Sequence, residues 1–280
     1  MNKIIAAFDG LKYAAATRDY SIALVKISNA HLFGVFLDDP TYTSYKIYEL
    51  VADEGVSEEK MNQLDAKDKT TRADAAKDFE QHCQKAAIEY SIHHDHQVAI
   101  QDLKHESVYA DLLLIGASET VTHYEEKMPT RFIRDLLADA QCPVLLLPDQ
   151  FTPIEKVVLL YDGEPSSVHA IKMFSYLLPG LGDVDTSLVS VNPPESNLHL
   201  KDNKLMKEYM IQHFPEAQTS VFKGLPEIEI VEYLKTQPAS TLVVLGAYRR
   251  GAVSRWFHES LADTIMKEVH LPLFIAHNKS

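Results

Sequence analysis

Short, largely apolar runs recur along the chain at wide intervals. The clearest are at 4–8, 32–37, 112–115, 144–147, 157–161, 187–191, 242–245 and 273–275. Runs of four to six residues without polar alternation are typical of strands whose two faces are both covered. Two weaker strands are predicted at 88–93 and 218–222.

Stretches with helical spacing separate these strands. In the clearest example, Pro165 is placed to open a helix, because proline suits the first helical position. Val168, Ile171 and Phe174 then fall on one face, and a Pro-Gly pair at 179–180 ends the segment. Strands that alternate with helices in this way predict a parallel α/β sheet.

Three segments of the first half recur, in the same order, in the second half. The matched pairs are 4–10 with 157–163, 112–117 with 242–247, and 142–147 with 271–276. An ordered set of matches indicates two copies of one five-stranded unit. We therefore predict two domains, 1–150 and 151–280.

The first copy is longer than the second. From the Asp of its first strand to the Gly of its fourth it runs 107 residues, against 84 in the second copy. The extra residues lie at about 41–77 and are strongly charged from Asp53 onward, and helical spacing continues at Phe79 and Cys83. We expect an extended, partly solvated helical insertion there.

Composition and charge narrow the functional classes. The 280 residues are 46% apolar and 24% charged, a normal globular balance. A net charge of −13 disfavours a general nucleic-acid binder or a polybasic membrane-surface protein. We find no secretory segment and no apolar run long enough to span a membrane, so we expect a soluble, cytoplasmic protein.

Candidate chemistry lies where the predicted strands end. In an open parallel sheet, ligands bind beyond the carboxyl ends of the strands, where the strand order reverses. The first strand of each copy ends in Asp-Gly, at Asp9 and Asp162, and the fourth ends at Gly116 and Gly246. A carboxylate there can accept from ribose or adenine, and a glycine lets backbone amides approach a phosphate.

These residues resemble the universal stress protein family, and the chain resembles a tandem two-domain member. The Asp-Gly turn, the segment 110–116 and the segment 142–145 carry the resemblance, which covers nearly everything except the insertion at 41–77. It implies two five-stranded parallel α/β (Rossmann-like) units with strand order 3-2-1-4-5. It also implies pairing through the last strands, and binding of ATP or AMP by a Gly, two residues, Gly, nine residues, Gly-Ser pattern.

The second copy keeps part of that phosphate pattern. Gly246 occupies the first glycine position and Ser260 is retained, whereas Arg249 and Glu259 replace the other two glycines, with Gly251 nearby. The arginine can replace lost amide contacts to a phosphate, but the carboxylate repels one. A monophosphate or nucleoside is therefore favoured over a triphosphate.

The resemblance also places nucleoside contacts in this copy, with Asp162 at the ribose or base and Val191 against adenine. The nucleotide-binding residues it implies are Asp162, Gly163, Val191, Leu245, Gly246, Arg249, Gly251 and Ser260.

The first copy departs from the pattern further. Gly116 is kept, but Glu119 and Pro129 stand at the second and third glycine positions, and Thr130 could supply the hydroxyl. No arginine compensates, so we expect no nucleotide binding of the family's kind. The nucleoside positions that remain are Asp9 and Val35.

Each candidate also has a structural interpretation. Ser260 opens a capping-box pattern before the last helix, and the two strand-end aspartates could simply hold their turns. The histidines at 93–96 alternate sides on a strand, so two at most could share a metal. Ser166 and His169 lie near a helix start without a nucleophile elbow. We predict no metal site and no catalytic residues.

Three functions remain open from the sequence. The first is a cytoplasmic stress-response module that binds an adenine nucleotide or nucleoside in the second copy, with no required cofactor and ATP or AMP as the candidate ligand. The second is a nucleotide-free scaffold that acts through dimerisation or a protein partner. The third and least favoured is a slow ATP hydrolase. The last strands, 143–147 and 272–275, are apolar, and an uncovered apolar edge tends to find a partner. The resemblance implies that these two strands pair with each other within one chain; the sequence does not decide whether two chains then associate.

Overall fold

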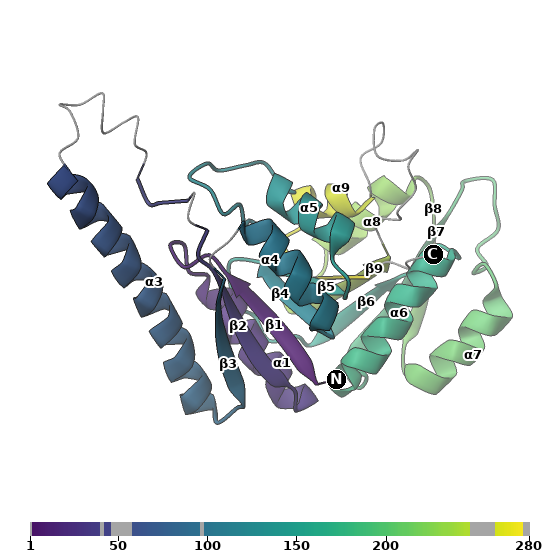
Figure 1. The fold of residues 1–280 in the computed structure, drawn as a ribbon. Coiled ribbons are helices and arrows are strands. Elements are labelled where there is room, and N and C mark those ends of the chain that lie inside the picture. Colours follow the sequence, from purple (N-terminus) through teal and green to yellow (C-terminus); the bar gives the residue numbers. More distant parts are fainter. Residues whose placement is uncertain (1, 40–41, 46–57, 96–97, 247–260, 277–280) are drawn as a thin grey trace.

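The ten strands that the sequence predicts all form, and they build one sheet (Figure 1). The computed structural model describes residues 2–39, 42–45, 58–95, 98–246 and 261–276. The strands before residue 150, here the first half, are β1 (Lys3–Phe8), β2 (His31–Leu37), β3 (Tyr90–Asp95), β4 (Leu112–Gly116) and β5 (Val144–Leu147). Those of the second half are β6 (Lys156–Leu160), β7 (Asp185–Asn192), β8 (Gln218–Lys223), β9 (Thr241–Gly246) and β10 (Leu273–Ala276).

The strand order confirms the predicted topology. Across the sheet it is β3-β2-β1-β4-β5-β10-β9-β6-β7-β8, so each half has the order 3-2-1-4-5. Within each half all pairs are parallel. Parallel strands buried on both faces explain why the apolar runs are continuous rather than alternating.

The two halves join at an antiparallel seam between β5 and β10. Leu145 lies opposite Phe274, with Val144 opposite Ile275 and Leu146 opposite Leu273. These side chains are 0–2% exposed. The apolar edges therefore cover each other within one chain, as the sequence led us to expect.

Helices cover both faces of the sheet. One face carries α1 (Ala15–Ser28), α3 (Glu58–Ala86), α6 (Pro165–Leu177) and α7 (Asn203–His213). The other carries α4 (Ala99–Glu106), α5 (Arg131–Asp139), α8 (Pro226–Lys235) and α9 (Leu261–Glu268). Each face has its own core, and both cores run across the seam, because each combines residues of the two halves.

From residue 58, the predicted insertion in the first half is part of one long helix, whereas residues 42–45 are irregular. Helix α3 has 29 residues, of which only Asp68, Ala75, Phe79 and Cys83 are buried. Phe79 anchors it, packing against Phe8 at 5.4 Å between ring centroids and filling the space above Gly34, where a Cβ would meet its ring at 2.7 Å. From residue 58 onward the described part of the predicted insertion lies in this largely exposed helix, and residues 46–57 lie outside the described chain.

Both cysteines are buried and free, and burial raises the pKa of the Cys83 thiol to about 12. Over the described residues, no helix combines the length and the apolar character that crossing a membrane requires.

Candidate functional site

The predicted second-half site lies at the carboxyl ends of β6, β7 and β9. Strand β6 pairs with both neighbours, so the turn at Asp162, the end of β7 at Val191 and the end of β9 at Gly246 meet at one edge. The missing side chain of Gly246 matters here, since a Cβ would meet the carbonyl oxygen of Ser166 at 2.4 Å. This close approach brings the end of β9 against the first turn of α6.

Of the other predicted residues, Leu245 is 3% exposed and belongs to the core, so only its backbone faces the edge. Arg249, Gly251 and Ser260, together with Glu259, lie outside the described residues. Their predicted roles at a phosphate stay predictions.

Asp162 is exposed, and its carboxylate is fixed in place. Its Oδ1 accepts from the amide of Glu164 at 2.8 Å and from the hydroxyl of Ser167 at 2.6 Å. Gly163 takes the positive φ of +82° that the turn requires. The aspartate therefore holds its turn, as the structural interpretation expected, while it remains accessible to a ligand.

Lys201 covers this turn, which sequence reasoning did not anticipate. Its Nζ donates to the carbonyl of Asp162 at 2.8 Å, and its own carbonyl accepts from the Tyr161 hydroxyl at 2.9 Å. A Cβ on Gly163 would meet the lysine stem at 2.5 Å. The lysine lies 39 residues along the chain in an irregular segment, so no local pattern could have revealed the contact.

Asp9, the equivalent aspartate of the first half, is buried. Asp9 is 0% exposed, and its Oδ1 accepts from the amides of Leu11 at 2.8 Å and Lys12 at 3.3 Å. Within the described chain its Oδ2 has no partner in hydrogen-bonding geometry. Burial raises the pKa of Asp9, and the Leu11 amide, followed by the Tyr42 hydroxyl, opposes the shift.

Glu119 occupies the position of the second phosphate glycine in this half. Its Oε1 accepts from the amides of Thr120 and Val121, both at 2.9 Å. Burial, followed by the charge of Asp9, raises the pKa of Glu119 to about 7. Thr130 caps α5 and donates its hydroxyl to the Glu119 carbonyl at 2.6 Å, so the hydroxyl suggested for a ligand is engaged in the fold.

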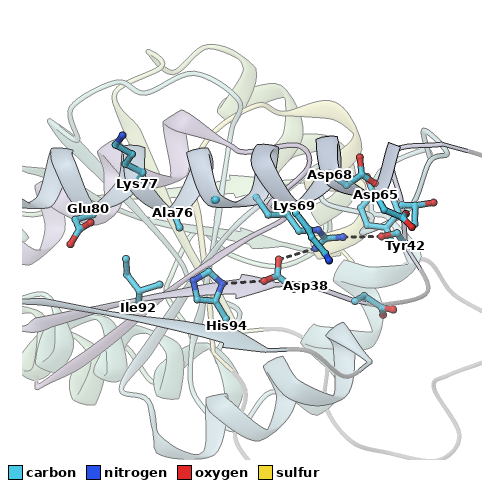
Figure 2. Close-up of a pocket in the computed structure, with 14 residues that line it drawn as sticks. Asp38, Tyr42, Asp65, Asp68, Lys69, Ala76, Lys77, Glu80, Ile92 and His94 are labelled. Atoms are coloured by element: carbon cyan, nitrogen blue, oxygen red, sulfur yellow. Dashed lines mark hydrogen bonds and ion pairs between the residues drawn. The ribbon is translucent and has the colours of Figure 1, made fainter. Parts of the chain in front are cut away.

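A cavity of about 880 Å³ lies in the first half between α3 and strand β3 (Figure 2). Asp38, just beyond β2, accepts from Arg72 of α3 at 2.8 Å and contacts His94 of β3 at 3.0 Å. Arg72 also donates to the carbonyls of Leu37 and Tyr42. These contacts fix one wall of the cavity.

The histidines at the end of β3 do not form a metal site over the described chain. His93 contacts Glu106 at 2.8 Å on one side of the strand, and His94 contacts Asp38 on the other. The described residues contain no group of three or more metal-ligating side chains. His96 lies outside them.

Comparison with known proteins finds similarity to solved structures but no match by sequence. No protein-family model matches the chain, and no curated protein matches its sequence. The structure is similar to a universal stress protein from Archaeoglobus fulgidus DSM 4304, with a TM-score of 0.70 and 14% identity over 99% of this chain and 98% of that one.

Two further solved structures also match almost the whole chain. A Pseudomonas aeruginosa UCBPP-PA14 protein assigned to the same class gives a TM-score of 0.58 at 16% identity, covering 99% of this chain and 93% of that one. The cytoplasmic domain of a prokaryotic cation chloride cotransporter gives 0.52 at 11% identity, covering 98% and 94%. Together with the strand order, the likenesses to the two universal stress protein structures show that the chain has the tandem fold of those proteins over 99% of its length.

Proposed function

We propose that the protein is a cytoplasmic stress-response module of the universal stress type that binds an adenine nucleoside or its monophosphate in the second half. The observation that supports this most is the contrast between two aspartates at matched positions. Asp162 is exposed and oriented by Ser167, whereas Asp9 is 0% exposed. Only the second-half carboxylate is placed to accept from a ribose hydroxyl without rearrangement.

Electrostatics support the same assignment. Glu119 puts a carboxyl group at the first-half position of the second phosphate glycine, where its ionised form would repel a phosphate. In the second half, Lys201 brings an ammonium group to the strand-one turn. A ligand that carries one phosphate on a nucleoside matches this distribution of charge.

The proposed function is binding alone and contains no catalytic step. It also does not require two chains to pair through their last strands. The resemblance implies that universal stress proteins dimerise through their last strands. In this chain the corresponding edges, β5 and β10, are already paired with each other. The scaffold alternative would therefore have to use another surface, and it predicts that adenine compounds have no effect.

Asp162→Asn is expected to weaken the binding of adenosine and AMP by about 10–100-fold, because a hydrogen bond to a charged group contributes about 1.5–3 kcal/mol. Asparagine keeps the oxygen that orders the turn, so the fold is preserved. Isothermal titration of both ligands into wild type and variant measures the change. Asp9→Asn is the matched control and should leave both affinities unchanged. Equal affinity of Asp162→Asn and wild type would refute the site.

A further inference from the structure

The side chain of Asp68 is buried at one end of the cavity beside α3. It is 6% exposed, and its Oδ2 accepts from the amide of Ser44 at 2.7 Å. Within the described chain its Oδ1 is buried without a hydrogen-bond partner. A buried carboxylate oxygen without a donor has lost its hydration without compensation, so a donor supplied by a ligand would stabilise this end.

The charges around the cavity favour a cation. Three carboxylates of low exposure, Asp38, Asp39 and Asp68, line it, and the Arg72 side chain, 14% exposed, pairs with Asp38. Arg72 is already committed to Asp38 and two carbonyls. The lysines that line the cavity, at 69 and 77, are exposed, and Figure 2 shows Lys77 directed away from β3.

The cavity is elongated along the helix, with carboxylates toward both ends. Asp65 and Asp68 lie at one end and Glu80 at the other, with Ala76 and Ile92 between them (Figure 2). Twelve residues of helix from Asp68 to Glu80 span about 18 Å at about 1.5 Å per residue. The contacts of Arg72 and His94 with Asp38 lie along one wall between the two ends. Acidic ends joined by a stretch that also presents Ala76 and Ile92 suit a chain of methylene groups with an ammonium group at each end.

The oxygen atoms that line the Asp68 end of the cavity suit an ammonium group better than a metal ion. The described residues contain no group of three ligating side chains, which a divalent ion would require. At the Asp68 end, a second carboxylate (Asp65) and the hydroxyl-bearing Thr43 also line the cavity. An ammonium group has three donors and can satisfy such a mixed set of acceptors.

We propose that the cavity between α3 and β3 binds a linear aliphatic polyamine, with one ammonium group at Asp68 and another toward Glu80. The site lies in the first half and uses the helical insertion. It is therefore separate from the adenine site proposed for the second half, and either can fail without the other.

Isothermal titration with spermine at about 0.15 M ionic strength tests the proposal. Wild type is expected to bind one spermine, and putrescine, which is too short to reach both ends, is expected to bind at least 10-fold more weakly. Asp68→Asn keeps the shape and the acceptor for Ser44 and should lose at least 10-fold in spermine affinity. Asp74→Asn removes an exposed carboxylate of the same helix and should change the affinity less than twofold.

Three results would overturn the proposal. They are no spermine binding by wild type, equal losses in Asp68→Asn and Asp74→Asn, and displacement of spermine by Mg²⁺ at matched charge, which would indicate a diffuse ionic attraction. If Asp68→Asn does not fold, as judged by circular dichroism, Asp65→Asn replaces it with the same expected loss.

Discussion

Replacing Phe274 with alanine is expected to lower the free energy of unfolding by about 3–5 kcal/mol, the usual cost of deleting a buried phenylalanine ring. Phe274 is 0% exposed at the centre of β10. It lies opposite Leu145 across the seam and packs edge-on against Phe174 at 5.6 Å. Its loss removes contacts from a core that both halves share.

Denaturant unfolding followed by circular dichroism measures this change. Leu205→Ala is the control, because Leu205 on α7 is 67% exposed and its truncation should cost less than about 0.5 kcal/mol. A loss below about 1 kcal/mol for Phe274→Ala would contradict a seam that contributes to the stability of the whole sheet.

Glu119→Gln is expected to stabilise the protein by about 2–3 kcal/mol at pH 8, with almost no effect at pH 4. Burial and Asp9 raise the pKa of Glu119 from 4.5 to about 7. Between these values the folded state holds a proton that the unfolded state has released, so wild-type stability falls as the pH rises through this window. Glutamine keeps the acceptor for Thr120 and Val121 and removes the charge.

Unfolding free energies of both proteins from pH 4 to pH 8 test this expectation. Glu125→Gln on the same loop is the control, because Glu125 is exposed and its replacement should not change with pH. A stability difference between Glu119→Gln and wild type that is constant over the range would mean that Glu119 ionises normally.

The strands could be predicted because their signal is local. Runs such as 112–115 are apolar at every position, since parallel strands are covered on both faces. Even the weak strands at 88–93 and 218–222 form, as β3 and β8, at the two edges of the sheet. Edge strands are more polar because a neighbour on one side is missing, which explains their weaker pattern.

The sequence predicts the different phosphate loops of the two halves, but not the burial of Asp9 against the exposure of Asp162, because that contrast depends on long-range contacts. The sequence has Asp-Gly at both strand ends and therefore suggests two equal turns. In the structure Arg72 packs over Gly10, with its Cγ 3.1 Å from where a Cβ would lie, and Lys201 packs over Gly163. Both cations come from the crossover between the second and third strands of their half. No spacing rule relates them to the turns that they cover.

The most direct measurement of the central claim is mass spectrometry of ligand released from freshly purified, denatured protein, with Asp162→Asn prepared in parallel. The account predicts one adenine nucleoside or monophosphate per chain from wild type and a greatly reduced amount from the variant. Wild-type protein that releases no adenine compound, and that binds neither adenosine nor AMP when they are added, would contradict it.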